Sequence, residues 1–254
     1  KKSIVLTGGG TMGHVSPNIA IIPSLCKNYD EIHYIGSEKG IEKEKISSLT
    51  QQFPSLVYHS IPATKLDRRN ILKNLSIPFI LFKATKECKK LLQEIKPCIV
   101  FSKGGYVSVP VCKTAGKLNI PLVIHESDLS MGLANKLSSK YATTICTTFA
   151  ETCKSERSIH TGSPINPALA LSNPLDATIK FNLNPNLKTI CITGGSLGAS
   201  AINNAFLKIL PSISNDYNII LLTGKGKKVD FKHPNFHQEE FSNNIGSIFK
   251  ASDL

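Results

Sequence analysis

Short apolar runs alternate along this chain with segments whose apolar residues recur every three or four positions. The runs predict buried strands and the periodic segments predict helices. Before residue 150, strands are expected at 3–7, 31–35, 56–61, 98–102, 121–125 and 143–147, with helices at 17–27, 40–49, 109–118 and 132–140. Such alternation is typical of an α/β fold with a parallel, doubly wound sheet. Ser16 and Pro17 suggest the start of the first helix.

The same alternation resumes near the end of the chain. Strands are expected at 188–193, 217–222 and near 235–241, with helices at 199–210 and 243–250. Residues 164–187 between the two sets carry four prolines among Asn and Ser residues, which predicts a linker. The expected organisation is therefore a Rossmann-like domain at 1–163, a linker at 164–187 and a second Rossmann-like domain at 188–254. Residues 251–254 look like the entry to a further strand, so we expect the second domain to be incomplete in this chain.

Each expected domain opens on a similar motif. Residues 2–10, KSIVLTGGG, resemble residues 188–196, KTICITGGS, and each copy precedes an expected helix. Glycine lets the backbone approach a ligand, while a helix N-terminus offers unpaired N–H groups and roughly half a positive charge. The repetition predicts two nucleotide-type domains facing one cleft.

Composition narrows the class of protein. The net charge of +12 comes almost wholly from lysine, because Arg68, Arg69 and Arg157 are the arginines of the sequence. Few guanidinium groups argue against a nucleic-acid partner and favour attraction to diphosphates or acidic lipid headgroups. A basic nucleic-acid-binding module is an alternative that rests on net charge alone. Seven cysteines without C-x-x-C spacing favour a reducing cytosol and predict neither a disulfide framework nor a zinc site.

The first glycine loop allows a second interpretation. Gly8, Gly10 and Gly13 form G-x-G-x-x-G after a strand, as in dinucleotide-binding proteins. That function needs an acidic residue after the second strand, and Glu38 is the candidate. A nicotinamide- or flavin-dependent oxidoreductase is therefore an alternative, although it leaves the second glycine loop unexplained.

Two further groups suggest chemistry beside this loop. His14 directly follows it and could act as a base, or could be a helix-start histidine bonded to a backbone carbonyl. Glu126 and Asp128 leave the strand at 121–125, where carboxylates are candidates for a general base or for sugar-hydroxyl contacts. The alternative is that Asp128 or Ser130 caps the helix at 132–140.

A third glycine junction follows the strand at 98–102. Gly104, Gly105 and Tyr106 stand between that strand and the next expected helix. If its strand neighbours the first strand, the two loops line one crevice at the carboxyl edge of the sheet.

Residues 65–90 combine apolar and basic side chains, and Pro78 interrupts any single helix there. Such a surface suits contact with an anionic membrane. An ordinary core helix with a basic outer face, or a membrane-surface adaptor without enzymatic activity, are the alternatives. The residues expected at a membrane surface are Leu72, Leu75, Phe79, Phe82, Arg68, Arg69, Lys73 and Lys83. The longest apolar run, 77–82, is far shorter than the ~20 residues that span a bilayer.

Taken together, the loops resemble one family. They are GGGTMGHVSP at 8–17, FSKGGYVSVP at 101–110, IHESD at 124–128 before GLANK at 132–136, and GGSLGA at 194–199. The chain resembles the bacterial peptidoglycan glycosyltransferases that add N-acetylglucosamine to undecaprenyl-diphosphate-linked N-acetylmuramoyl-pentapeptide. The resemblance implies a GT-B fold, with the donor bound mainly by the second domain and the lipid-linked acceptor, lipid I, mainly by the first.

The resemblance also implies the reaction and its setting. It implies an inverting transfer from UDP-N-acetylglucosamine to the 4-hydroxyl of the muramoyl sugar, giving lipid II, without metal or cofactor. The enzyme would be peripheral, at the cytoplasmic face of the bacterial cell membrane. His14 is the first choice for the base and Glu126 the second. Relatives continue for roughly another half domain, so this chain alone is expected to bind UDP-sugar poorly.

Further site residues follow from matching positions. The donor residues are Thr11, Met12, Gly13, Asp128, Asn166, Gly195 and Ser196, and the acceptor-diphosphate residues are Gly9, Gly10, Gly104, Gly105 and Tyr106. Met12 stands where the family commonly has glycine. Asn166 stands where relatives carry an arginine for the donor phosphate, and Lys225 is a possible substitute for that charge.

Overall fold

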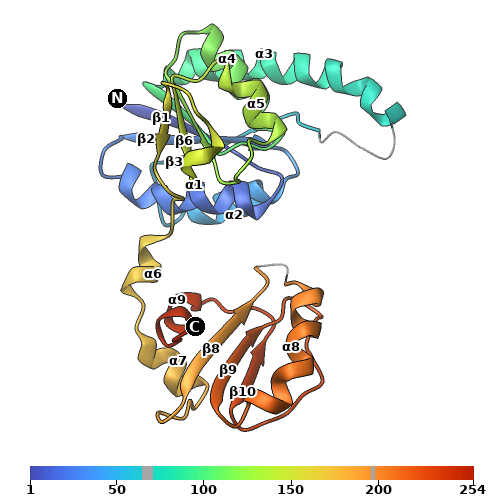
Figure 1. Cartoon of the computed structure of the whole chain (residues 1–254). Helices are drawn as coiled ribbons and strands as arrows, with labels where there is room; N and C mark the ends of the chain where they lie inside the picture. Colours follow the sequence, from blue (N-terminus) through green and yellow to red (C-terminus); the bar gives the residue numbers. More distant parts are fainter. Residues whose placement is uncertain (65–70, 196–197) are drawn as a thin grey trace. The chain divides into compact units, whose positions relative to one another are not determined.

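The computed structural model spans residues 1–254. It describes all of them except 65–70 and 196–197, and for 71–73 it describes the backbone but not the side chains. It divides into two compact units, Lys1–Asn166 and Pro167–Leu254 (Figure 1). Each unit has its own sheet, so the expectation of two separate α/β domains is confirmed.

The described part of the first unit forms a seven-stranded parallel sheet in the order β3-β2-β1-β4-β5-β6-β7. The strands are β1 (Ser3–Thr7), β2 (Glu31–Ser37), β3 (Leu56–Ile61), β4 (Ile99–Ser102), β5 (Leu122–Glu126), β6 (Thr144–Thr147) and β7 (Ser158–His160). All five residues of β1 are buried, which explains why its sequence is a continuous apolar run rather than an alternating one. The short strand β7 carries one apolar residue, Ile159, and was not predicted.

Helices cover both faces of this sheet. Figure 1 shows α1 (Met12–Leu25) and α2 (Ile41–Leu49) on one face, and α3 (Ile77–Ile95), α4 (Ser108–Lys117) and α5 (Leu133–Ser139) on the other. Two 3₁₀ segments, η1 (Ile71–Ser76) and η2 (Ala150–Thr152), complete the unit. Two apolar cores result: Leu6, Val15 and Ile32 belong to the core under α1 and α2, and Val5, Val111 and Ile124 to the core under α3 and α4.

The strand order reverses direction at β1. Strands β2 and β3 extend the sheet on one side of β1, and β4 to β7 extend it on the other. Thr7 at the end of β1 pairs in register with Ser102 at the end of β4. The loops that follow these two strands therefore leave the sheet side by side at its topological switch point, where ligands bind in open α/β sheets.

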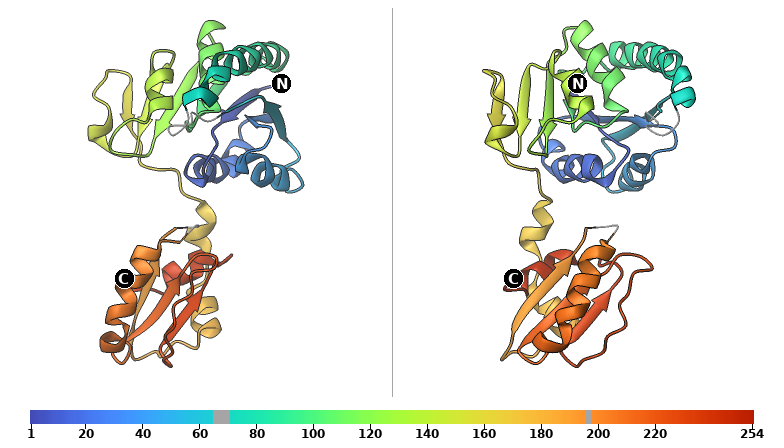
Figure 2. Two further views of the ribbon diagram at one scale, coloured as in Figure 1. Left: turned by 90° about the vertical axis from the view of Figure 1, so that its right-hand side faces the viewer. Right: turned by 45° about the vertical axis from the view of Figure 1, so that its right-hand side comes forward.

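The second unit repeats the design on a smaller scale. Its described residues form a three-stranded parallel sheet, β10-β9-β8, from β8 (Lys188–Thr193), β9 (Tyr217–Leu222) and β10 (Phe236–Glu239). Figure 2 shows α8 (Ser200–Ile213) on one face of this sheet and α7 (Pro174–Lys180) with α9 (Ile245–Lys250) on the other. The N–H of Cys191 donates to the carbonyl of Leu254 (2.7 Å) and that of Asp253 to the carbonyl of Thr189 (2.8 Å). Residues 253–254 thus lie along the free edge of β8, as expected for the entry to a further strand.

The expected linker needs correction. Residues 167–187 belong to the second unit, where they form α6 (Pro167–Leu171) and α7. Pro174 occupies the first turn of α7, and Asn173 caps that helix by accepting the N–H of Leu175. Ala177, Phe181 and Leu183 lie in the core with Ile248 of α9. The prolines start helices here rather than keep the segment open, and the boundary between the units falls after Asn166.

Two helix starts also differ from expectation. Helix α1 begins at Met12, immediately after the glycine loop, and Pro17 lies inside it. Ser16 is therefore not its cap; burial of Val15 and Ile22 against the sheet holds the helix although Pro17 lacks an N–H. Helix α5 begins after Gly132, without a side-chain cap, so neither Asp128 nor Ser130 caps it.

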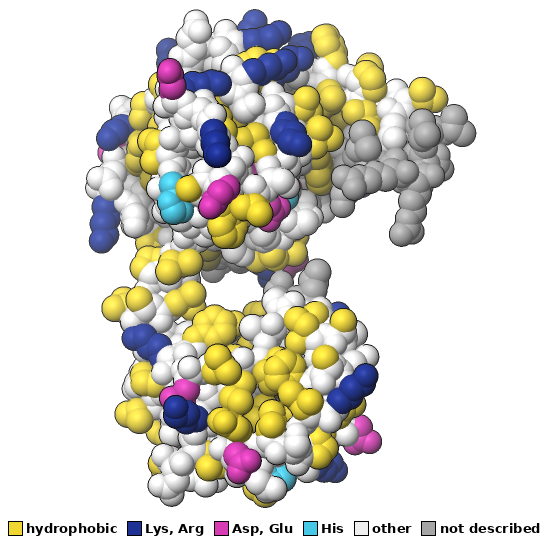
Figure 3. Space-filling model, in the orientation of Figure 1, with side chains coloured by type: hydrophobic (Ala, Val, Ile, Leu, Met, Phe, Trp, Pro, Cys, Tyr) yellow, Lys and Arg dark blue, Asp and Glu magenta, His cyan; other side chains and the backbone are white. Residues whose placement is uncertain are grey.

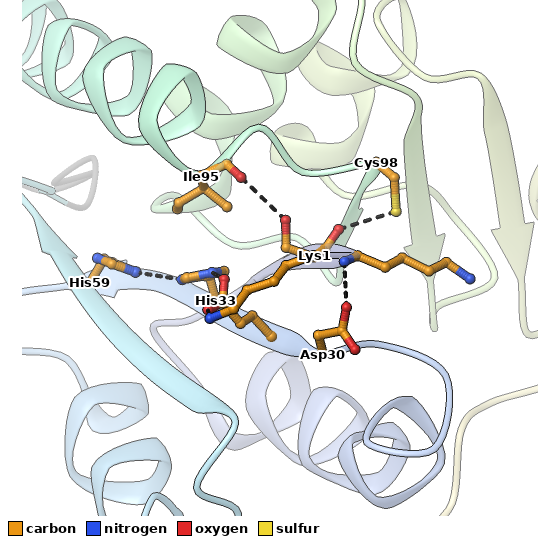
Figure 4. Close-up of polar contacts among 9 residues, drawn as sticks. Lys1, Asp30, His33, His59, Ile95 and Cys98 are labelled. Atoms are coloured by element: carbon orange, nitrogen blue, oxygen red, sulfur yellow. Dashed lines mark hydrogen bonds and ion pairs between the residues drawn. The ribbon is translucent and has the colours of Figure 1, made fainter.

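Two histidines, one from β2 and one from β3, lie within hydrogen-bond distance of each other. His33, 8% exposed, has its Nδ1 2.9 Å from Nε2 of His59 (Figure 4). Burial lowers the pKa of His33, against an opposing effect of Glu31. Burial also lowers the pKa of His59, the charge of His33 lowers it further, and Glu94 opposes this. Since one ring must accept the shared hydrogen bond, both rings cannot be protonated in this geometry.

We predict that the first unit loses stability as the pH falls below about 6.5, the unperturbed histidine pKa. The unfolded chain then binds more protons than the folded one, so protonation favours unfolding. Substituting His59→Gln reduces this loss, whereas His160→Gln, at an exposed histidine of β7, leaves it unchanged. Urea unfolding at several pH values measures the effect, and identical pH profiles for H59Q and the unmodified chain would contradict it.

Candidate active site

Two glycine loops interlock at the carboxyl edge of the first sheet. The N–H of Gly9, after β1, donates to the carbonyl of Gly104, after β4 (3.3 Å), and the N–H of Lys103 donates to the carbonyl of Thr7 (2.9 Å). Gly105 has a positive φ of +86°, and a Cβ there would lie 2.2 Å from the carbonyl oxygen of Gly9. Glycine is therefore required at 105 by conformation and by space. The loops predicted to line one crevice do lie against each other.

A buried carboxylate fixes the shape of the first loop. Glu42, in the first turn of α2, is fully buried and accepts the N–H of Gly10 (3.1 Å) and both the N–H and the hydroxyl of Ser37. A Cβ on Gly9 would lie within 3 Å of this carboxylate. The N–H of Gly10 is thus already used by the protein, and the carboxylate occupies the inside of a loop that a dinucleotide pyrophosphate would have to approach. Glu38, the expected ribose ligand, is exposed instead.

The start of α1 carries His14 at the rim of this loop. The ring is half-buried and its Nδ1 lies 3.0 Å from the hydroxyl oxygen of Thr11. Burial lowers the pKa of His14 and the nearby Lys103 lowers it further, while Glu126, the Gly9 backbone and Asp128 act in the opposite direction. The imidazole is therefore neutral at physiological pH, as a base must be.

Lys103 is a buried cation beneath the same loops. It is 2% exposed, and its ammonium donates to the hydroxyl of Ser127 in the loop after β5. Burial lowers the pKa of Lys103, and Glu126 and Asp128 oppose this shift. Among the described residues no carboxylate forms an ion pair with it, so its charge acts on the surrounding groups through a poorly hydrated interior.

Glu126 is held by hydrogen bonds on both oxygens. Oε1 accepts the N–H groups of Ser127 and Asp128, and Oε2 accepts the N–H of Gly132 (2.9 Å) and Nδ2 of Asn135 (2.9 Å). Burial opposes ionisation, but these four donors together lower the pKa of Glu126. A carboxylate in this environment links the loop after β5 to helix α5 through its hydrogen bonds. It is a weak proton acceptor. Glu126 is thus held in its ionised form by the protein itself.

The second unit presents its own glycine loop between β8 and α8. Gly195 has a φ of +79° and its N–H donates to the hydroxyl of Thr193 (3.2 Å). A Cβ on Gly198 would lie 2.1 Å from the carbonyl oxygen of Thr223, so this loop packs against the end of β9. Lys227 closes the contact by donating its ammonium to the carbonyl of Gly198 (3.0 Å). Ser196 lies outside the described residues.

Comparison with known proteins identifies the family. Residues 4–147 match the glycosyltransferase family 28 N-terminal domain and residues 189–254 match the glycosyltransferase family 28 C-terminal domain. The chain belongs to glycosyltransferase family 28. Its two sheets and interlocked glycine loops are thus those of a GT-B glycosyltransferase, and the fold predicted from the sequence is confirmed.

Several known proteins are similar to this chain along its whole length. A Lachnospira eligens protein named UDP-N-acetylglucosamine--N-acetylmuramyl-(pentapeptide) pyrophosphoryl-undecaprenol N-acetylglucosamine transferase is 44% identical over 259 residues, which cover 100% of this chain and 72% of that protein. The crystal structure of Acinetobacter baumannii MurG matches with a TM-score of 0.72 at 24% identity, over 100% of this chain and 72% of that one. A crystallised glycotransferase of kitacinnamycin matches with a TM-score of 0.70 at 12% identity, over 99% and 74%.

The predicted donor residues of this family 28 chain differ in their exposure and in the unit that carries them. Thr11, Gly13 and Asp128 are exposed at the rim formed by the first loop and the loop after β5. Met12 instead packs its side chain against the core that contains Val15. A larger residue than glycine is therefore accommodated here by turning inward. Asn166 is exposed at the end of the first unit, and Lys225 is exposed in the second.

The predicted acceptor-diphosphate residues of the first unit lie together. A Cβ on Gly10 would lie 2.7 Å from the ring of Tyr106, so that ring packs over the first loop. Gly9 and Gly104 are buried, whereas Gly10 is exposed. Because Glu42 already binds the N–H of Gly10, a diphosphate here would depend on the N–H groups at the start of α1, where Thr11 supplies no side-chain cap.

Several residues of this site were not predicted from the sequence. Glu42, Lys103 and Asn135 are polar side chains in loops or helix starts, where solvent exposure is the usual outcome. Gly36 and Gly40 shortly precede Glu42, and a Cβ on either would meet its side chain, but this contact is visible only in the folded structure. Within the described ranges, no group of three or more histidine, cysteine or carboxylate side chains is placed to hold a metal ion.

We predict that Gly105→Ala destabilises the first unit by more than about 2 kcal/mol, because positive-φ strain adds to a collision with the carbonyl of Gly9. The matched control is Gly162→Ala, which has a φ of +72° but nothing within 4 Å of the added Cβ. That variant loses about 1 kcal/mol from strain alone. Urea unfolding measures both, and equal losses would show that the loops do not interlock.

Proposed function

We propose that this family 28 glycosyltransferase transfers N-acetylglucosamine from UDP-N-acetylglucosamine to undecaprenyl-diphosphate-linked N-acetylmuramoyl-pentapeptide, converting lipid I to lipid II for peptidoglycan synthesis. The observation that carries this proposal is the whole-chain similarity to relatives with that printed activity, joined to a site that offers a neutral histidine. The oxidoreductase alternative lacks support, since Glu42 occupies its loop and the family match names glycosyltransferases.

His14 is proposed as the base. With Nδ1 bonded to Thr11, Nε2 accepts the proton of the acceptor 4-hydroxyl as that oxygen forms a bond to C1 of the donor sugar. The bond from C1 to the diphosphate oxygen breaks, and its electron pair leaves with UDP. Attack opposite the leaving group inverts the configuration at C1.

Charge on the leaving UDP needs a positive environment. We propose that the first turn of α8 supplies it, with Gly195 and Ser196 beside the donor. The helix spans 14 residues, and its N-cap, Ala199, provides no side-chain hydrogen bond to the first turn, whose N–H groups and helix dipole favour an anion. Lys225 and Asn166 stay proposed contacts of the donor diphosphate.

We propose that exposed side chains of η1 and α3 form a membrane-binding surface. Leu75, Phe79 and Phe82 are 77%, 73% and 71% exposed, and Lys83 lies beside them. Figure 3 shows hydrophobic side chains gathered over the outer end of α3. The later turns of α3 bury Ala84, Cys88 and Leu92 against the sheet side, so the core-helix interpretation holds for that half. Arg68 and Arg69 lie outside the described residues, as do the side chains of Leu72 and Lys73.

This surface would bind the membrane from outside the bilayer. Along the described parts of the chain, no helix is both long and apolar enough to cross a membrane. We therefore propose a peripheral enzyme at the cytoplasmic face, where its lipid-linked acceptor would be reached by insertion of apolar side chains between anionic headgroups.

For the base, we expect His14→Ala to lower kcat by about 10²- to 10⁴-fold with little change in the KM for UDP-N-acetylglucosamine, because a proton acceptor is lost and donor contacts remain. The assay uses a short-chain acceptor lipid and the complete gene product, since relatives are longer than this chain. His160→Ala, an exposed histidine of β7, serves as the control. A kcat for H14A within about threefold of the unmodified enzyme would exclude His14 as the base.

For the membrane surface, the double variant Phe79→Ser and Phe82→Ser is expected to bind phosphatidylglycerol vesicles at least about tenfold more weakly, as two apolar side chains no longer leave water. Phe149→Ser changes an exposed aromatic residue outside α3 and should leave binding unaltered. Vesicle cosedimentation gives both affinities. Unchanged binding of the double variant would remove α3 from the proposal.

A further inference from the structure

One lysine of the second unit is held at both ends against the segment that begins α8. Lys227 is half-buried, and its ammonium donates to the carbonyl of Gly198 (3.0 Å). Its backbone carbonyl accepts Nδ2 of Asn203, in α8 (3.2 Å). A lysine side chain has a flexible four-carbon stem, so two attachments to the same segment restrict where this charge can lie.

Asn203 makes the support for Lys227 rigid. It is 2% exposed, and its Nδ2 also donates to the carbonyl of Thr223 at the end of β9 (2.9 Å). A Cβ on Gly198 would lie 2.1 Å from the same carbonyl oxygen. The loop before α8 and the loop after β9 therefore meet through their backbones, and the ammonium of Lys227 lies on that junction.

The junction lies at the N-terminus of α8. Gly198 directly precedes the N-cap, Ala199, and α8 begins at Ser200. Consecutive Cα atoms are about 3.8 Å apart, so the carbonyl of Gly198 lies within a few residues' length of the first N–H groups of the helix. Charges interact over about 10 Å at 0.1 M salt, and the ammonium of Lys227 therefore acts on an anion bound at these N–H groups.

The hydrogen bond itself has a second electrostatic effect. The carbonyl oxygen of Gly198 carries a partial negative charge, which disfavours an anion at the same helix end. The ammonium of Lys227 offsets that charge and adds its own to the positive end of the helix dipole.

We propose that Lys227 is a positioning residue for the donor, whose fixed charge strengthens binding of the UDP diphosphate at the N-terminus of α8. The inference rests on the proposed function, in which the first turn of α8 receives the leaving UDP. The diphosphate gains negative charge as the bond to C1 breaks, so a fixed positive charge favours both its binding and its departure. Lys227 does not itself contact the donor in this role, since its ammonium stays on the carbonyl of Gly198.

The test measures UDP affinity of the complete gene product by isothermal titration, and uridine affinity by competition with UDP. Lys227→Met removes the charge and is expected to weaken UDP binding about three- to tenfold. Uridine has no phosphate, so its affinity should stay unchanged. Lys227→Arg retains the charge and should bind UDP more tightly than K227M. Lys228→Met, at the exposed neighbouring lysine, makes the same change in net charge and should bind UDP as the unmodified protein does.

Each result has a stated meaning. Unchanged UDP affinity in K227M, an equal loss in K228M, an equal loss for uridine, or equal affinities of K227R and K227M overturns the inference. If K227M does not fold, Lys227→Gln decides, because it keeps a donor for Gly198 without the charge; weaker UDP binding supports the inference and unchanged binding overturns it. An unmodified protein that binds UDP as expected but transfers no N-acetylglucosamine contradicts the proposed function alone, whereas one that does not bind UDP overturns both.

Discussion

The carbonyl oxygen of Gly9 lies where a side chain on residue 105 would have to be. This contact brings the loops after β1 and β4 together at the point where the sheet reverses its strand order. All other features of the site are built on it. It places the first glycine loop against both neighbours, since a Cβ on Gly10 would meet the ring of Tyr106 and one on Gly8 would meet Cβ of Lys103. The site is thus formed by backbone packing, and the side chains that act in it are carried on a rigid edge.

Two buried charges of opposite sign lie on either side of the first loop. Glu42 binds the N–H of Gly10 and fixes the outer part of the loop, while Lys103 packs against Gly8 at its inner part. Burying each charge costs desolvation free energy, since neither is fully compensated by an ion pair within the described residues. Glu42 gives the loop one shape, and that shape differs from an open dinucleotide cradle. The G-x-G-x-x-G pattern therefore predicted a glycine loop at the carboxyl edge of the sheet but not the shape of that loop.

The sequence alone predicts those features of the fold that depend on buried apolar runs and on glycine. The bounds of β1, β3, β8 and β9 were predicted correctly, because each contains three or four consecutive apolar residues followed by a polar one. The helix start at Met12 was missed, since Pro17 gives a strong local signal that packing of Val15 overrides. Residues 164–187 were taken for a linker because prolines mark both loops and first helical turns. Buried Lys103 and Glu42 could not be predicted, as burial of a charge depends on residues distant in sequence.

Glu126 and His14 illustrate how environment, rather than residue type, divides these roles. Both lie near the same rim, and both can in principle take a proton. Glu126 accepts four hydrogen bonds, which stabilise its ionised form and lower its pKa, so it holds the loop after β5 in place. His14 is half-buried with a side-chain contact to Thr11, and burial, together with the charge of Lys103, lowers its pKa. A base must be unprotonated before it reacts, and a strongly stabilised carboxylate gains little by accepting a proton. The fixed carboxylate and the half-buried imidazole thus lie in different surroundings, because four N–H donors converge on Glu126 whereas the ring of His14 contacts the hydroxyl of Thr11.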